Sequence, residues 1–501
     1  MAKKTYILYG FILLKFVIHY FAIGPEYDLD HDEMFHLDLG KHLAWGYTSV
    51  PPVTSWISYI IIHLGNSVFW VKFFPALFGA LTMVVVWKTI EELKGNLYAL
   101  ILGSVCITFS LIFVSTNLAF HPSSLDFLLW TVMLFTIFKF INSENNIWLW
   151  MASLTFAIGF LNKYNIGFLV LGLLPAVLMT KHRKIFRNKH FYLSILAAFI
   201  IVSPNLIWQY QNDFLGIHHL NELVNTQLVY LNRYDFLLEQ FNYVAISFIV
   251  IPPAFISFFR YAPFKKYIIF FWTYIFTISI YLYLNAKPHY PLGLYPILIA
   301  FGAVYMEKLL KNGWLRNIRP AAVLWPVSAF LLLLPITLPV YPTGWIKQNV
   351  WVKTITGGEL PPYFTTKLGW SELANIVDDA FDSISDKENT LIQCDWYGQA
   401  AAINYYSKQN YTEAVAMHAD YINWFPLDEM EIKNIILVKN RGDTDKSREK
   451  EKPLFETISY VGEIKNVYSQ EYGAKVYLLK GAKQSINEIL RKEIQERNNN
   501  R

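Results

Sequence analysis

Long uncharged stretches constrain this chain more than any other feature. The segment between Lys94 and Asp126 contains no Asp, Glu, Lys or Arg, and comparable apolar stretches recur up to Val340. A bilayer-spanning helix needs roughly 20 mostly apolar residues. Only 16% of the residues are charged, whereas a soluble domain carries about 25%. We therefore expect a polytopic α-helical membrane protein.

The apolar stretches divide into eleven predicted spans. Proline interrupts several of them, for example at Pro75 and Pro204, which neighbouring helices accommodate in a membrane. The stretches on either side of Lys163 are short, so they are either two spans or one span and a re-entrant piece. The predicted spans cover residues 5–23, 68–88, 97–117, 124–142, 146–162, 164–181, 191–209, 236–259, 267–285, 290–307 and 320–340.

Basic loops predict the orientation of these spans. Clusters of Lys and Arg at 181–189, 260–266 and 308–319 fall on the same side as the N-terminal lysines when eleven spans are counted. The positive-inside rule makes that side cytoplasmic. The first loop, about 24–67, and the tail, 341–501, are then extracytoplasmic. The first apolar segment is expected to be an uncleaved helix in the cytoplasmic (inner) membrane.

Two domains are predicted: a transmembrane domain over 1–340 and an extracytoplasmic α/β domain over 341–501. In the first loop, residues 54–63 are too short to span and predict a helix in the membrane interface. The charged residues from Leu490 onward are expected to fray. In the tail, strands are expected at Thr390–Cys394, Ile435–Val438 and Ala474–Leu479, and helices at Ser371–Ala380 and Gly398–Tyr406.

The first loop carries a dense group of acidic and histidine side chains. One interpretation is a set of solvated loop charges, and the other is a catalytic carboxylate or a metal site. His31, Asp32 and His36 place possible ligands near one another, but their spacing matches no strong zinc motif. No metal is assigned, although a divalent ion is compatible with the loop. The group consists of Asp28, Asp30, His31, Asp32, Glu33, His36 and Asp38.

Several short motifs, in a fixed order, resemble one family of membrane enzymes. These are the C-type-fold glycosyltransferases related to protein O-mannosyltransferases and aminoarabinose transferases. Each motif is weak alone, but their order along about the first 310 residues is specific. The motifs are Asp32-Glu33, Leu39–Tyr47, Pro51–Trp56, Phe120–Asp126, Leu161–Tyr164, Pro204–Gln209 and Lys287–Pro296, with Asp395–Ala400 less distinctive.

The resemblance implies transfer of a sugar from a polyprenyl-phosphate donor to a glycolipid, glycan or protein acceptor. It makes Asp32 the general base and Glu33 a supporting carboxylate. A single base and a good leaving group imply inversion at the anomeric carbon. The expected partners are the donor, the acceptor and the lipid bilayer, and no nucleic acid is expected.

Lysines outside the basic cytoplasmic clusters are candidates for the donor phosphate. Lys163 and Lys287 lie in family-like motifs on the predicted extracytoplasmic side. Lysine binds phosphate as a compact charge. The alternative is that each lysine only extends its ammonium group from the end of a span to water. Weaker candidates for the same pocket are Tyr164, Arg233, His289 and Tyr290.

Asp126 is a further candidate for the site, and the alternative is a structural role. Ser123 stands where many relatives carry an acidic residue, so the acid of this loop is either absent or replaced by Asp126.

Two other classes of function fit a polytopic chain. A transporter or a flippase of lipid-linked sugars predicts inverted repeats and charges at the bilayer midplane. The sequence contains no convincing internal repeat, and its acids gather in a loop. A non-catalytic assembly factor would need neither Asp32 nor the lysines. Neither the sugar nor the acceptor follows from the sequence.

Overall fold

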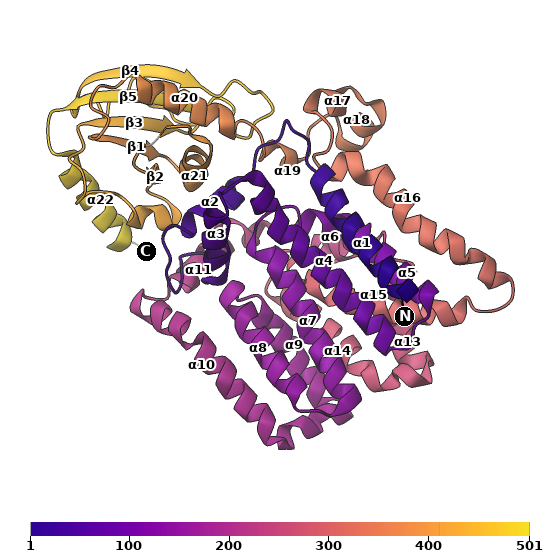
Figure 1. Cartoon of the computed structure of the whole chain (residues 1–501). Helices are drawn as coiled ribbons and strands as arrows, with labels where there is room; N and C mark the ends of the chain where they lie inside the picture. Colours follow the sequence, from indigo (N-terminus) through magenta and orange to yellow (C-terminus); the bar gives the residue numbers. More distant parts are fainter. Residues whose placement is uncertain (1, 410, 500–501) are drawn as a thin grey trace. The chain divides into compact units, whose positions relative to one another are not determined.

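Two compact units make up the computed structural model, which describes residues 2–409 and 411–499. The first, here the membrane unit, comprises Met1–Ala22, Ala44–Trp56 and Leu64–Val340. The second, the tail unit, comprises Ile23–Leu43, Ile57–His63 and Tyr341–Arg501. The first loop of the chain is therefore divided between the two units. Figure 1 labels their helices and strands.

The membrane unit is helical, as the sequence predicts (Figure 1). Helix α3 (Val53–His63), whose residues are divided between the two units, confirms the short helix expected in the first loop. The other helices are α1 (Ala2–Phe21), α4 (Val68–Glu92), α5 (Leu97–Thr108), α6 (Leu111–Thr116), α7 (Pro122–Ser143), α8 (Ile147–Asn162), α9 (Ile166–Leu178), α10 (Lys189–Gln211), α11 (Leu215–Thr226), α12 (Arg233–Val244), α13 (Ile251–Arg260), α14 (Ile268–Tyr283), α15 (Tyr295–Leu309) and α16 (Arg319–Thr337).

The protein is an integral multi-pass membrane protein. Six helices among the described residues are long and apolar enough to cross a bilayer. A seventh is counted if α9 and the segment Lys181–Arg187, bent by 107°, form one span. The prediction of eleven spans is not confirmed by these lengths.

Two predicted spans are broken rather than continuous. Residues 97–117 divide into α5 and α6, because Ser110 has an extended backbone before the new helix. Residues 236–259 divide into α12 and α13. Pro252 and Pro253 occupy the first turn of α13, where the missing N–H costs no helical hydrogen bond.

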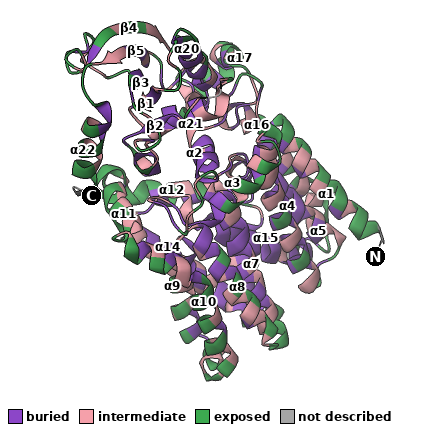
Figure 2. Cartoon of the chain, turned by 60° about the vertical axis from the view of Figure 1, so that its left-hand side comes forward, coloured by how far each residue is buried: buried purple, intermediate pink, exposed green. Residues whose placement is uncertain are grey.

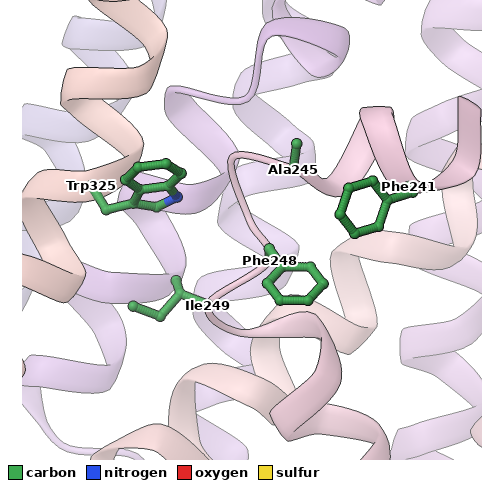
Figure 3. Close-up of a pocket in the computed structure, with 5 residues that line it drawn as sticks. All are labelled: Phe241, Ala245, Phe248, Ile249 and Trp325. Carbon is green, nitrogen blue, oxygen red and sulfur yellow. The ribbon is translucent and has the colours of Figure 1, made fainter.

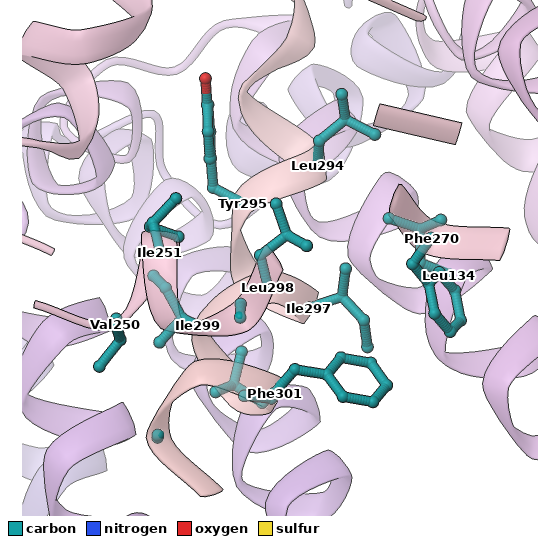
Figure 4. Packing of buried hydrophobic residues seen from close by; sticks show 14 of the residues in the cluster. Leu134, Val250, Ile251, Phe270, Leu294, Tyr295, Ile297, Leu298, Ile299 and Phe301 are labelled. Atoms are coloured by element: carbon teal, nitrogen blue, oxygen red, sulfur yellow. The ribbon is translucent and has the colours of Figure 1, made fainter. Parts of the chain in front are cut away.

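Helix α15 lies at the centre of the membrane unit. The most apolar part of the segment Tyr290–Leu309, which includes α15, is 89% buried, whereas that of α10 is only 22% buried. Figure 2 shows this contrast, and Figure 4 shows α15 side chains packing with residues of α7, α13 and α14. Gly302 permits this packing, since a Cβ there would lie 1.9 Å from the Val250 carbonyl oxygen. The outward face of α10 instead presents apolar side chains such as Phe199 and Ile200 to the lipid.

An apolar groove opens on the membrane unit where α12 and α13 are interrupted (Figure 3). Its volume is about 450 Å³, and almost all of its exposed lining is apolar. The lining residues are Phe241, Ala245, Phe248, Ile249 and Trp325.

The tail unit has an α/β structure, as predicted. Its five-stranded sheet has the order β2-β1-β3-β5-β4, with β1 parallel to β2 and β3, and β5 antiparallel to β3 and β4. Its strands are β1 (Thr390–Cys394), β2 (Val415–Ala416), β3 (Asn434–Lys439), β4 (Phe455–Glu463) and β5 (Lys475–Ala482). Its helices are α2 (His31–Leu39), α17 (Thr343–Gln348), α18 (Val350–Thr356), α19 (Pro362–Thr365), α20 (Trp370–Asp382), α21 (Tyr397–Tyr406) and α22 (Ile486–Asn499).

The prediction that the chain frays from Leu490 is wrong up to Asn499, because α22 continues through this segment. Leu490 is buried in the apolar cluster under the sheet. The Arg497 guanidinium donates to the Met417 carbonyl at 3.2 Å and pairs with Glu493. Packing of one apolar face therefore stabilises a helix whose other residues are mostly charged.

Candidate active site

The acidic run of the first loop forms the start of α2. Asp30 caps the helix: its Oδ1 accepts from the Asp32 N–H at 3.2 Å, and its own N–H donates to Glu33 Oε2 at 3.0 Å. This reciprocal arrangement is a capping box, which satisfies N–H groups that the first helical turn leaves unpaired. Two of the acids, Asp30 and Glu33, therefore have an explanation in local structure.

A buried lysine neutralises these two acids. Lys367 follows α19, and its Nζ lies 3.3 Å from Asp30 Oδ2 and 3.7 Å from Glu33 Oε2. The side chains of Lys367 and Glu33 are both fully buried. Burial alone lowers the pKa of Lys367, but Tyr363, Asp30 and Glu33 outweigh burial and raise it. Burial likewise opposes the charge of Asp30, and Lys367 and His31 bring its pKa well below the usual range.

Asp32 differs from its neighbours because it reaches solvent. Its side chain is 39% exposed, and its Oδ1 accepts a hydrogen bond from the Tyr397 hydroxyl at 2.8 Å. Burial, followed by the charge of Asp32, raises the pKa of Tyr397, so the phenol keeps its proton and acts as the donor. Among the acids at the start of α2, Asp32 combines a fixed orientation with access to a second molecule.

The turn after β1 brings Tyr397 to this position. The Asp395 carboxylate accepts from Lys439 Nζ at 2.6 Å and from the Asn440 N–H at 2.8 Å. These contacts join the carboxyl ends of the parallel strands β1 and β3, the edge at which open α/β sheets commonly place their sites. The edge holds Tyr397 at the first position of α21.

The His31 ring lies among aromatic rings at the same place. Its centroid is 5.2 Å from Trp396, 5.8 Å from Tyr397 and 6.1 Å from Trp370. Donor atoms of Asp30, His31 and Asp32 lie within 4.8 Å of one another, as a metal site would require. However, Asp30 already contacts Lys367 and caps α2, and Asp32 Oδ1 is held by Tyr397. These contacts hold the acidic side chains in place without a bound metal ion.

The membrane unit contains a second polar cluster, built around Lys163. Its Nζ donates to Ser123 Oγ at 2.9 Å and lies 4.9 Å from the centre of the Tyr290 ring. Lys287 and His289 lie close enough to Lys163 to interact with it electrostatically. Four of the residues predicted for phosphate binding, Lys163, Lys287, His289 and Tyr290, are therefore neighbours, although they come from segments more than a hundred residues apart.

Asp126 is linked to this cluster through Asn165. It is 5% exposed, and its Oδ2 accepts from the Asn165 amide at 2.8 Å. The same amide donates to the Tyr290 carbonyl at 3.0 Å, and Asn165 Oδ1 accepts from the Tyr281 hydroxyl at 2.6 Å. Asp126 therefore joins α7 to the turn that carries Tyr290.

Two other predicted residues have different surroundings. The Tyr164 hydroxyl donates to Asn205 Oδ1 at 3.1 Å and accepts from Gln209 Nε2 at 3.0 Å, which links it to α10. Arg233 is exposed, and its Nε–H donates to the Leu282 carbonyl at 3.1 Å. A role of either residue in binding phosphate stays a prediction.

Comparisons with known proteins identify the fold of the chain. Residues 49–208 match the family model of the dolichyl-phosphate-mannose-protein mannosyltransferases. The crystal structure of ArnT from Cupriavidus metallidurans, bound to undecaprenyl phosphate, matches with a TM-score of 0.64 and 11% sequence identity, covering 96% of this chain and 99% of that one. This chain has the C-type membrane glycosyltransferase fold.

A second solved structure matches less well. AglB from Archaeoglobus fulgidus, in complex with an inhibitory peptide and a dolichol-phosphate, gives a TM-score of 0.42 and 11% identity, covering 87% of this chain and 69% of that one. No curated protein matches the sequence.

Within this C-type fold, sequence reasoning overlooked Lys367 and assigned Tyr397 no role. Lys367 is more than 300 residues from Asp30, and no motif surrounds it. Tyr397 lies in the family-like segment Asp395–Ala400, so a signal was present, but its partner Asp32 is 365 residues away. Only folding reveals either pairing.

Proposed function

We propose that this protein is an inverting glycosyltransferase that moves a sugar from a polyprenyl-phosphate donor to an acceptor on the extracytoplasmic face of the membrane. The observation that carries the proposal is Asp32, a carboxylate that reaches solvent while Tyr397 holds one of its oxygens. The family match over residues 49–208 and the ArnT-like fold support the same class of reaction.

Asp32 has the chemistry of a general base for this transfer. Its Oδ2 takes the proton of the acceptor as the acceptor oxygen forms a bond to the anomeric carbon. The bond between that carbon and the phosphate oxygen breaks on the opposite face, and the bonding electrons leave with the phosphate. One displacement inverts the configuration at the anomeric carbon.

The Lys163 cluster is suited to the phosphate that departs. Asp126 interacts electrostatically with Lys163, and the like charge of Lys287 beside it is an arrangement that a further anion stabilises. The Ser123 hydroxyl beside Lys163 adds a further polar group. We assign these residues to the donor phosphate, where fixed positive charge stabilises the negative charge that builds up.

The apolar groove beside α12 is suited to the polyprenyl chain of the donor. Gln240, the residue before Phe241, donates to the Pro288 carbonyl at 2.6 Å. The groove is therefore attached through α12 to the turn that carries Lys287 and His289. An isoprenoid chain would bury apolar surface against Phe241, Phe248 and Trp325.

Purified protein tests the reaction directly. Sugar release or transfer is measured with a panel of undecaprenyl- and dolichyl-phosphate sugars, beside Asp32→Asn and the control Asp379→Asn, which alters an exposed acid of the same unit. We expect donor-dependent turnover that Asp32→Asn lowers by about 10²-fold or more and that the control preserves. Full turnover in Asp32→Asn rejects the base. If no donor turns over while a lipid-linked sugar crosses vesicle membranes, the flippase alternative is correct.

Charge removal tests the phosphate site. Lys163→Gln and Lys287→Gln are compared with Lys311→Gln, which alters an exposed lysine of the same unit. Losing one group that stabilises developing charge costs about 10²–10³ in rate, so we expect a loss of this size for the first two. Equal activity of all three variants contradicts the assignment.

Blocking the groove tests whether it binds the polyprenyl chain of the donor. Ala245→Trp fills part of the groove, so we expect it to raise KM for a long-chain donor and to leave KM for a short isoprenyl donor unchanged. If KM changes equally for both donors, the groove is not the binding site of the polyprenyl chain.

A further inference from the structure

We propose that Tyr397 is a positioning residue for the base Asp32, so that the tail unit takes part in catalysis with every acceptor instead of only selecting among acceptors. The inference rests on the proposed function, in which Asp32 accepts the proton. The observations that carry it are the 2.8 Å hydrogen bond from the Tyr397 hydroxyl to Asp32 Oδ1 and the packing that holds the phenol in place.

The Tyr397 ring is held on both sides. The His418 ring stacks on it, with centroids 5.3 Å apart and planes 11° apart. Phe35 of α2 packs against it at 5.1 Å, and Trp396 meets it edge-on at 5.0 Å. A ring packed in this way points its hydroxyl in one direction, so its hydrogen bond fixes the carboxylate of Asp32 at little further cost in conformational entropy.

This hydrogen bond gives the two oxygens of Asp32 different roles. Oδ1 accepts from Tyr397, which leaves Oδ2 for the proton of an acceptor. A donor aimed at a carboxylate also favours its charged form. Tyr397 therefore holds the base in one orientation.

Other charged and titratable groups face the pair from each element packed against it. On α2, His31 Nε2 lies 3.6 Å from Asp32 Oδ1, and Asp30 interacts electrostatically with Tyr397. Lys367 stands behind Asp30 and neutralises it. His418 covers the phenol ring. Because two histidine rings and a second carboxylate lie beside the pair, the variant must be compared with the parent protein over the whole pH range.

A purely structural tyrosine makes a different prediction. It would lower stability when truncated and would leave the pH dependence and kcat of the folded enzyme unchanged. The decisive readouts are therefore kcat and the pH–rate profile, measured on folded protein.

The experiment uses the full-length protein in detergent or vesicles. Donor-dependent turnover is measured from pH 5 to 9 for the parent, for Tyr397→Phe and for Tyr411→Phe. Tyr411 is the control from the same unit, because its hydroxyl bonds to the Ile403 carbonyl at 3.4 Å and interacts with Ser407, neither of which belongs to the proposed site. We expect Tyr397→Phe to lower kcat by about 10- to 100-fold and to leave KM for the donor unchanged. The acidic limb of the pH–rate profile should move to higher pH. Tyr411→Phe should match the parent.

A second variant keeps the inference testable if Tyr397→Phe folds poorly. Replacement of Tyr397 by 3-fluorotyrosine preserves the ring and strengthens the phenol as a donor, so the acidic limb should move to lower pH. An unchanged kcat and profile in the folded variants overturns the inference. If Asp32→Asn is inactive while both Tyr397 variants behave like the parent, this inference fails and the proposed function stands. If Asp32→Asn is fully active, the proposed base itself fails.

Discussion

Acidic residues that look alike in the sequence have different roles at the start of α2. The Asp28 carboxylate accepts from the N–H groups of Trp370 and Ser371, at 2.9 and 3.2 Å, and so caps α20. Asp30 caps α2, and Glu33 is paired with a buried lysine. The hydrogen-bond and ion-pair partners therefore distinguish the structural carboxylates Asp28, Asp30 and Glu33 from Asp32. Among these four, only the Asp32 side chain combines a hydrogen bond with wide exposure to solvent.

Truncating Lys367 is expected to destabilise the tail unit strongly. Lys367→Met removes the charge that faces Asp30 and Glu33, and an unpaired buried charge costs about 3–5 kcal/mol. Thermal unfolding of the variant measures the loss, with the exposed Lys465→Met as the control. A melting temperature equal to that of the control would show that the two acids do not need the lysine.

The other end of α2 predicts a dependence of stability on pH. Burial opposes the charge of Glu413, but the hydrogen bond from His42 and the charge of Lys41 lower its pKa from 4.5 to about 2. The carboxylate therefore contributes stability above pH 4.5, and this contribution is lost as pH falls towards 2. Because its side chain is 33% exposed, we expect only about 1 kcal/mol.

Unfolding of the parent and of Glu413→Gln between pH 2 and 7 tests this dependence. The difference between the two should be largest at neutral pH and should vanish near pH 2. A difference that stays constant across the range would mean that the Gln variant changes packing instead of charge.

At the level of elements, local patterns were enough where packing agrees with them. The predicted strand Thr390–Cys394 has the bounds of β1, because its apolar residues fill the centre of the sheet. The edge strand β4 was not predicted, since its exposed residues alternate with no clear buried face. The spans 97–117 and 236–259 were predicted as continuous because hydropathy does not detect a change of backbone direction at Ser110 or before Pro252.

In the candidate site, too, the sequence predicted the residues that lie in local motifs but not the contacts that depend on the fold. Asp32 and the two lysines lie in local motifs, so the sequence pointed to them. Lys367 and Tyr397 act on α2 across more than 330 residues, and such pairing depends on how the tail folds around the first loop.

Helix packing at α15 predicts the effect of one methyl group. Gly302→Ala would place a Cβ 1.9 Å from the Val250 carbonyl oxygen, so α15 and the start of α13 must move apart. Overpacking of this kind costs about 1–3 kcal/mol. Gly167→Ala is the matched control, because its Cβ would meet no atom within 4 Å and alanine favours a helix.

Thermal unfolding in detergent compares the two glycine variants. We expect Gly302→Ala to melt below the parent and Gly167→Ala to melt at or above it. Equal melting temperatures would show that the contact between α13 and α15 relaxes without cost.

For the whole molecule, the number of spans decides where the two ends lie. An odd number places the N-terminus and the tail on opposite sides of the membrane, and an even number places them on the same side. The six long apolar helices are an even set, whereas the eleven predicted spans are an odd one. Short helices such as α8, with 16 residues, therefore matter, because they cross only if the helix and its flanking turns together match the bilayer.

Cysteine labelling resolves this question in intact cells. Cys106 and Cys394 are buried, so the parent should react weakly with a membrane-impermeant maleimide. Single cysteines replace the exposed residues Lys184, Glu222, Lys311 and Gly442. We expect 222 and 442 to label in intact cells, and 184 and 311 to label only after permeabilisation, because basic loops stay in the cytoplasm. Labelling of 184 together with 442 in intact cells would contradict the eleven-span prediction and would require a new assignment of the face on which Asp32 works.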